Sequence, residues 1–271
     1  MSVGRFRAPL RRREDQTSGG PLSSPGRSLL GGAAEAALEL IFPSNIYCLC
    51  CEDQMESSRI HGICDICSEK IDWNISDPLE RDLDMFAFDG VLPCCRYGFY
   101  PRRIISGMKL SGRPYAARSI GRLMGERLFI SGLDFDFLAA VPMHRDKERA
   151  RGFNQAELLA RFAAEEYERL SSRSAGYVPG LMQKTEATAS MRTSDAVKRR
   201  SLLHTSFSLS SQYADIICNR KIILADDVVT TGSTADACAR ILKEAGAERV
   251  YLLCFASGSG EVLQEERRDP V

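Results

Sequence analysis

Short apolar runs alternate with amphipathic stretches along the second half of the chain. Three such runs predict buried strands, and they lie at Phe137 to Val141, Lys221 to Ala225 and Val250 to Phe255. Apolar residues at helical spacing predict one helix that Asn154 and Gln155 open and another from about Ala235 to Ala245. This order of elements predicts an α/β fold over residues 82–258, in which helices cover both faces of a mostly parallel sheet.

The ends of the chain follow a different pattern. Residues 1–28 contain six arginines among Pro, Gly and Ser and few apolar residues, which predicts a disordered tail. An Arg- and Ser-rich organellar transit peptide is the alternative, although the segment shows no clear amphipathic helix. A short amphipathic helix is expected from Leu29 to Phe42 and opens a small unit spanning residues 29–75. The charged residues 259–271 are expected to fray.

Two C-x-x-C pairs follow the Leu29–Phe42 helix, and their cysteines are Cys48, Cys51, Cys64 and Cys67. Two such turns bring four thiolates to one tetrahedral point, which predicts a closed, structural zinc ribbon. The spacing between the pairs is shorter than usual, so Cys50 or His61 could replace one ligand. Reduced core cysteines or disulfides are the alternative, and disulfides are disfavoured in a cytoplasmic protein.

Composition narrows the class of protein without identifying it. The 271 residues include 36 basic and 36 acidic side chains, and this balance argues against coating nucleic acid through bulk charge. No apolar run approaches the roughly 20 residues that a membrane-spanning helix needs. We therefore expect a cytoplasmic protein with one medium domain and a small appendage.

The segment that follows Lys221 carries the strongest functional signal. Asp226 and Asp227 are expected at the carboxyl end of a strand, where open α/β sheets bind ligands. A turn with hydroxyls, a glycine and the first N–H groups of a helix comes next, formed by Thr230, Thr231, Gly232, Ser233 and Thr234. Such a turn suits a phosphate, while ribose hydroxyls and magnesium would satisfy the acids. The pattern predicts a phosphorylated sugar; an ordinary strand-to-helix turn is the alternative.

A strongly positive loop is expected between Pro142 and Phe153. Arg151 and Gly152 come directly before a helix start, where a guanidinium and backbone donors can hold a pyrophosphate. Lys109 follows an apolar helical stretch and could neutralise the same group. The alternatives are a solvated basic loop and an ordinary surface lysine.

Residues 221–234 resemble the signature for 5-phosphoribosyl-1-pyrophosphate (PRPP) in type I phosphoribosyltransferases. Together with the four-cysteine ribbon, two further blocks resemble the ComF family, whose zinc-ribbon, phosphoribosyltransferase-like proteins are linked to uptake of transforming DNA. The blocks are Ala140-Val141-Pro142-Met143 and Arg151-Gly152-Phe153-Asn154-Gln155-Ala156. The resemblance implies a type I phosphoribosyltransferase-like fold that binds PRPP and magnesium. In that family the two acids hold the ribose and the turn holds the 5-phosphate.

The chain departs from the family pattern between Lys184 and Phe207, a mobile flap in related enzymes. Met191 stands where a glutamine is expected and Leu202 where an asparagine is expected, which puts turnover in doubt more than binding. Two functions therefore stay open. One is a phosphoribosyltransferase that displaces pyrophosphate from PRPP with a nitrogen nucleophile. The other is a non-catalytic adaptor of natural transformation that binds single-stranded DNA and either PRPP or a nucleotide 5-phosphate.

Overall fold

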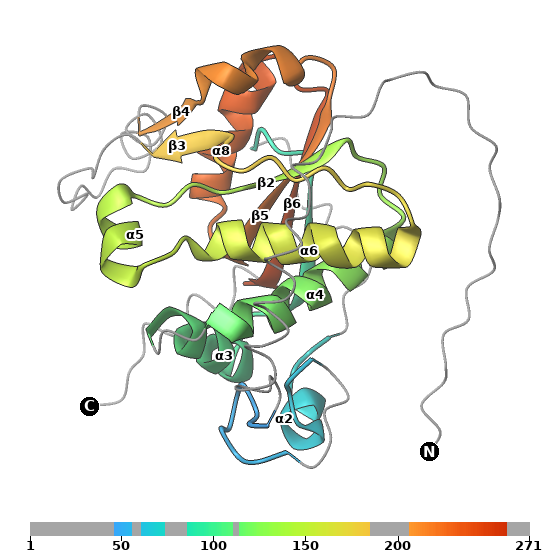
Figure 1. Cartoon of the computed structure of the whole chain (residues 1–271), viewed down its shortest axis with the longest axis vertical. Helices are drawn as coiled ribbons and strands as arrows, with labels where there is room; N and C mark the ends of the chain where they lie inside the picture. The colour runs from blue at the N-terminus through green and yellow to red at the C-terminus, as the bar shows by residue number, and fades with distance from the viewer. Residues whose placement is uncertain (1–45, 56–60, 74–85, 111–113, 185–205, 259–271) are drawn as a thin grey trace, which may run out of the picture.

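The computed structural model describes residues 46–55, 61–73, 86–110, 114–184 and 206–258 (Figure 1). Four sequence expectations concern other segments: the tail at 1–28, the helix at Leu29–Phe42, the end at 259–271, and the flap positions Met191 and Leu202. These lie outside the described residues.

A four-stranded parallel sheet forms the centre of the molecule, with strand order β1-β6-β5-β2. Its strands are β1 (Gly90–Arg96), β2 (Phe137–Ala140), β5 (Lys221–Val229) and β6 (Arg249–Ser257). A separate antiparallel pair joins β3 (Met182–Lys184) to β4 (Phe207–Leu209). The three strands predicted from apolar runs are confirmed as β2, β5 and β6.

The expected end of the β5 strand at Ala225 is wrong. Its ladder with β6 continues through the pairs Asp226 with Cys254 and Val229 with Ser257. The strand extends because β6 runs alongside and offers backbone partners as far as Ser257. Asp226 and Asp227 therefore lie inside the strand, three and two residues before its end.

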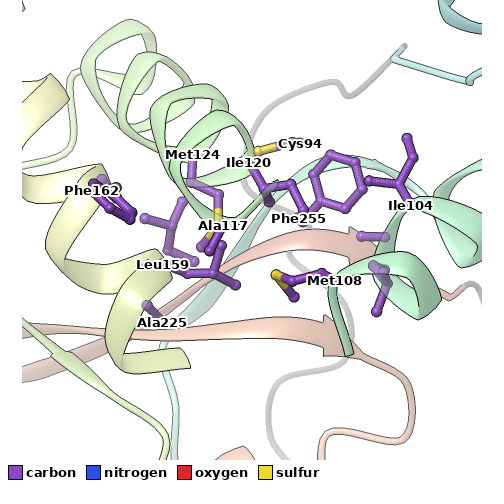
Figure 2. Packing of buried hydrophobic residues seen from close by; sticks show 14 of the residues in the cluster. Cys94, Ile104, Met108, Ala117, Ile120, Met124, Leu159, Phe162, Ala225 and Phe255 are labelled. Atoms are coloured by element: carbon purple, nitrogen blue, oxygen red, sulfur yellow. The ribbon is translucent and has the colours of Figure 1, made fainter. Parts of the chain in front are cut away.

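Helices cover both faces of the sheet. The described helices are α2 (Asp65–Glu69), α3 (Phe99–Leu110), α4 (Pro114–Ser131), α5 (Arg145–Arg151), α6 (Gln155–Ser171) and α8 (Ser233–Glu244), with a 3₁₀ helix at Ser211–Ile216. One core contains the buried residues of α3, α4 and α6, and Figure 2 shows Met108, Ile120 and Leu159 meeting there beside Phe255. A second core contains those of α8. The predicted α/β fold class is confirmed.

The side chains of β5 alternate between these two cores. Ile223 and Ala225 face the core of α3, α4 and α6, whereas Ile222 and Leu224 face the core of α8. Alternation of this kind is what a strand with both faces covered requires, and it explains why the sequence reads as one continuous apolar run. The same alternation assigns opposite faces to the two aspartates that follow.

The helices α4 and α6 pack at backbone distance through two glycines. A Cβ at Gly121 would lie 2.5 Å from the Cβ of Phe162. A Cβ at Gly125 would lie 2.6 Å from the carbonyl oxygen of Ala163. No side chain fits at either position, so the glycines set the close approach of the two helices.

The cysteine-rich ribbon packs onto the core of α3, α4 and α6. Leu49, Ile63 and Ile71 are buried within that core. The indole N–H of Trp73 donates to the carbonyl of Ser68 at 2.9 Å, and the Trp73 ring meets Phe255 edge to face at 6.4 Å. Figure 1 shows the ribbon and α2 at one end of the molecule, beside α3. Among the described helices, none is long and apolar enough to cross a membrane.

Candidate functional site

The two aspartates of β5 lie in different surroundings. Asp227 points to the same face of β5 as Ala225. Its Oδ2 lies 2.7 Å from Nζ of Lys109, the penultimate residue of α3. Asp226 points to the same face of β5 as Leu224, toward α8. On that helix, burial raises the pKa of the Cys238 thiol, and the charge of Asp226 raises it further. The structure thus brings Lys109 to the acids, where it neutralises Asp227.

Asp226 titrates near neutral pH. Burial raises the pKa of Asp226 to about 7, and the neighbouring charge of Asp227 adds to the rise. Two effects oppose it, namely the N–H of Asp227, which donates to Asp226 Oδ1 at 2.8 Å, and the positive charge of Lys109. A carboxyl group with this pKa can accept or release a proton under physiological conditions.

The turn after β5 opens helix α8 at a residue that has no side chain to cap it. Gly232 has φ +74° and precedes Ser233, the first residue of α8, whose N–H donates to Thr231 Oγ1 at 3.4 Å. The hydroxyls of Thr231 and Ser233 lie 3.0 Å apart, and Thr230 and Thr231 are exposed. Amides at a helix N-terminus and the positive end of the helix dipole favour an anion, so the turn is suited to a phosphate.

Gly232 cannot readily be replaced in this turn. Its φ lies in the left-handed region, which disfavours any residue with a Cβ. A Cβ there would lie in ordinary contact with the rings of Phe86 and Phe88, at 3.4 Å, and these rings stack with centroids 4.7 Å apart. The aromatic pair therefore fixes one wall of the turn.

The positive segment expected as a loop is instead the helix α5. His144 caps its start, since Nδ1 accepts the N–H of Asp146 at 3.1 Å. Gly152 ends it with φ +85°, and its N–H donates to the carbonyl of Glu148 at 2.7 Å. Acids in the first turn and arginines in the last turn stabilise this short helix through its dipole.

This helix changes what Gly152 and Arg151 can contribute. The amide of Gly152 is used within the C-terminal cap, which removes the backbone donor expected for pyrophosphate. The Arg151 guanidinium lies beside the sulfur of Met143, 4.0 Å from Sδ. No residue of α5 is buried, so its basic side chains stay accessible to an anion in solution.

Sequence reasoning missed Lys184. It lies at the end of β3, where a backbone bridge joins it to His144, and its Nζ lies 4.9 Å from the centroid of the Phe207 ring. Burial lowers the pKa of Lys184, and the positive charge of Lys147 lowers it further. Two cations that repel each other favour an anion between them. No sequence pattern indicates that Lys184 and Lys147 lie close together, because only the fold joins β3 to the start of α5.

Gln155, the first residue of α6, has an unsatisfied amide group. It is 1% exposed, and its Oε1 and Nε2 form no hydrogen bond to any described residue. The preceding Asn154 is satisfied, because its Oδ1 accepts the N–H of Ala156 at 3.1 Å and caps the helix. The predicted helix start is confirmed. The buried side-chain amide of Gln155 still needs a hydrogen-bond partner, because buried polar groups in proteins are normally hydrogen-bonded.

The four predicted ligand cysteines form one cluster. The sulfurs of Cys48, Cys51, Cys64 and Cys67 all lie within 4.8 Å of one another. The sulfurs of Cys51 and Cys64 are 3.8 Å apart. That separation is close to the spacing of about 3.8 Å that follows from tetrahedral Zn–S bonds of about 2.3 Å. The donor set and its geometry fit zinc.

Hydrogen bonds within the ribbon favour a thiolate at Cys48. The N–H groups of Cys50 and Cys64 each donate to Cys48 Sγ at 3.4 Å. Burial acts to raise the pKa of Cys48, but the backbone donors outweigh it and lower the pKa to about 7. None of the ten cysteines forms a disulfide in the structure.

The two substitute ligands considered from the sequence have other partners. The Cys50 thiol donates to the carbonyl of Tyr100 at 3.8 Å. Nε2 of His61 lies 2.9 Å from Oε1 of Glu126 on α4. Cys50 and His61 therefore attach the ribbon to α3 and α4 and stay outside the cysteine cluster.

Three bacterial proteins show the sequence relationships of the chain. The chain is 30% identical over 157 residues to the DNA utilization protein YhgH of an Escherichia coli strain, covering 56% of this chain and 65% of that protein. It is 29% identical over 115 residues to Competence protein F of Haemophilus influenzae, and the match covers 41% of this chain and 46% of that protein. It is 32% identical over 110 residues to Competence protein ComFC of Streptococcus pneumoniae, and the match covers 41% of this chain and 43% of that protein. The chain thus spans less than two thirds of each relative.

No family model matches the chain. Solved structures with partial likeness include an allosteric regulatory enzyme of purine biosynthesis, at 16% identity, a TM-score of 0.35, and coverage of 51% of this chain and 25% of that one. Another is a Leishmania donovani hypoxanthine-guanine phosphoribosyltransferase, at 13% identity, a TM-score of 0.31, and coverage of 52% and 71%. The sequence relatives confirm the predicted resemblance to ComF-type competence proteins.

Proposed function

For a chain whose relatives are ComF-type competence and DNA utilization proteins, we propose that the end of β5 binds PRPP together with magnesium. One observation carries this proposal: two adjacent carboxylates lie in a buried parallel strand, and after four more residues a left-handed glycine opens a helix without a capping side chain of its own. The acids can accept hydrogen bonds from ribose hydroxyls, and the helix amides can hold the 5-phosphate.

The cations near α5 would take the pyrophosphate half of the ligand. Lys147 and Lys184 repel each other in the free protein, so an anion between them would relieve that repulsion. Arg151 can add a bidentate contact, because no residue of its helix is buried. Magnesium would supply charge neutralisation on the pyrophosphate oxygens, and carboxylate oxygens of the kind it prefers stand at the site.

In the catalytic form of the proposal, a nitrogen nucleophile displaces pyrophosphate from C1 of the ribose. The C1–N bond forms as the C1–O bond breaks, and the departing pyrophosphate carries the electron pair. The basic side chains would stabilise that developing charge. We expect the ionised form of Asp226 to bind ribose better than the neutral form, so PRPP affinity should rise as pH increases through about 7.

A second candidate function is a non-catalytic adaptor that binds PRPP and single-stranded DNA. Asp227 is already paired with Lys109 at 2.7 Å, so one of the two acids must exchange a strong partner before it can engage ribose. The names of the relatives refer to competence and DNA utilization. These names favour a DNA-handling context.

Calorimetry tests PRPP binding directly. PRPP is titrated into wild type and into the double variant Asp226→Asn with Asp227→Asn, with and without magnesium. We expect at least about tenfold weaker binding in the variant, because each lost charged hydrogen bond is worth about 1.5–3 kcal/mol. The matched control Asp215→Asn makes the same chemical change at an exposed residue and should bind as wild type does. Equal affinity in all three proteins would exclude the proposed site.

Turnover separates the two candidates. Wild type is incubated with PRPP, magnesium and a panel of nucleobases and amines, and pyrophosphate release is followed. Release that depends on one acceptor and is lost in the double variant supports the transferase. Tight PRPP binding without acceptor-dependent release selects the adaptor.

A further inference from the structure

A cavity of about 370 Å³ lies between the ribbon and α3. Its lining is formed by Cys50 and Glu52 of the ribbon and by Phe99, Arg102, Arg103, Ser106 and Gly107 of α3. We name it the α3 groove. The α3 residues recur at three- and four-residue spacing, so they share one side of that helix. Lys109, which pairs with Asp227, is excluded from the lining, so the groove lies apart from the β5 aspartates.

An exposed aromatic ring stands beside a guanidinium in the α3 groove. Phe99 is 65% exposed. The Arg103 guanidinium carbon lies 5.9 Å from the centroid of the Phe99 ring, and Tyr100 meets that ring edge to face at 5.3 Å. Tyr100 thus supports Phe99 from the side, and Phe99 keeps most of its surface open to a flat ligand.

The charge around Phe99 selects an anionic partner. Arg102 and Arg103 contribute two positive charges, and Glu52 contributes one negative charge at the ribbon side. Lys70 adds a cation nearby, with its Nζ 5.6 Å from the centroid of the Tyr100 ring. An aromatic face with flanking guanidinium groups is the combination that stacks an unpaired base and holds its phosphate.

We propose that the α3 groove binds single-stranded nucleic acid, with one base stacked on Phe99 and the adjoining phosphate held by Arg103. The ring face can stack only on a base that is free of a duplex, which excludes double-stranded DNA as the preferred ligand. A cavity of this volume suits a ligand the size of one nucleotide. This inference rests on the DNA-handling candidate above and assigns its contact surface, away from the basic helix α5.

Fluorescence anisotropy with a labelled oligothymidine tests the inference on the full chain. We expect Phe99→Ala to weaken binding about tenfold, since stacking is worth about 1–3 kcal/mol per base. Phe99→Trp retains an aromatic face and should bind at least as well as wild type. Arg103→Gln should weaken binding and reduce the log–log salt slope by about 0.7. The control Arg173→Gln removes an exposed arginine elsewhere and should leave both unchanged.

The outcomes separate this inference from PRPP binding. If wild type binds oligothymidine and Phe99→Ala binds it equally well, the α3 groove is not the contact surface, even though a DNA role remains. Equal affinity for a duplex of the same sequence would overturn stacking on Phe99. If wild type binds no oligothymidine at low salt, the groove and the DNA role both fail, while calorimetry with PRPP still decides the β5 site. Zinc content equal to wild type in each variant shows that the ribbon is intact.

Discussion

Two neighbouring residues of the same type have different chemistry in this protein. Asp227 forms an ion pair with Lys109, whereas burial and the charge of Asp227 raise the pKa of Asp226. The difference arises because consecutive residues of a strand point to opposite faces, and Asp227 lies on the face where its Oδ2 is 2.7 Å from Lys109 Nζ. We therefore expect Asp226 to contribute to the pH dependence of stability.

The fold should lose stability as pH rises from about 4 to about 7. The unfolded chain ionises Asp226 near its ordinary pKa of 3.8, while the folded protein holds the proton until about pH 7. The native state then binds more protons than the unfolded state, so the free energy of unfolding falls with increasing pH. Asp226→Asn removes this effect and should stabilise the protein by about 1–3 kcal/mol at pH 8.

Urea unfolding of wild type and Asp226→Asn at pH 5 and pH 8 measures this difference. The gap between the two proteins should widen from pH 5 to pH 8, and the exposed Asp215→Asn should show no such change. A less stable Asp226→Asn protein at pH 8 would mean that the ionised carboxylate has a stabilising partner.

At the scale of the elements, the contact between α4 and α6 depends on glycine. A Cβ at Gly125 would lie 2.6 Å from the Ala163 carbonyl and 2.7 Å from the Glu166 Cβ. Gly125→Ala should destabilise the protein by about 1–3 kcal/mol, because the helices must separate to relieve this overlap. The loss should exceed the gain of about 1 kcal/mol in helix propensity.

Gly107→Ala on α3 is the matched control, since a Cβ there meets nothing within 4 Å. It should stabilise the protein by about 0.5–1 kcal/mol through helix propensity alone. Chemical unfolding of both variants measures the two effects. Stabilisation by both alanines would show that α4 and α6 can move apart without loss of packing.

At the scale of the whole molecule, the ribbon and the α/β domain share one hydrophobic core. Leu49, Ile63 and Ile71 of the ribbon are buried in the same cluster as α3 and α4. Loss of zinc should therefore lower the melting temperature of the whole protein as well as loosening its N-terminal third.

Metal analysis and thermal unfolding test this coupling. Purified protein should contain one zinc per chain, and Cys48→Ser with Cys64→Ser should lose the metal and melt at a lower temperature. Cys218→Ser changes an exposed cysteine outside the cluster and should retain both zinc and melting temperature. Unchanged metal content in the double serine variant would make the cysteines ordinary core residues.

Much of this molecule could be predicted from local sequence patterns. The runs at residues 137–141, 221–225 and 250–255 correspond to β2, β5 and β6, and the four cysteines of the two C-x-x-C pairs cluster as expected. The turn at Gly232 also opens a helix. These features depend on residues close together in the chain. A strand buried on both faces needs a continuous apolar run, a tetrahedral thiolate site needs paired cysteines, and a left-handed turn favours glycine.

Apart from α5, which its local caps His144 and Gly152 delimit, the features missed or misjudged depend on residues far apart in the chain. Asp226 lies within β5 because β6 continues alongside it. Lys109 pairs with Asp227 across more than a hundred residues, and Lys184 meets α5 through a bridge to His144. The sequence thus specified β2, β5, β6, α6 and α8 and the types of group that they carry. The packing of α3, β3 and α5 around the sheet set which charges are paired, because ion pairs and pKa values depend on distances that no local pattern encodes.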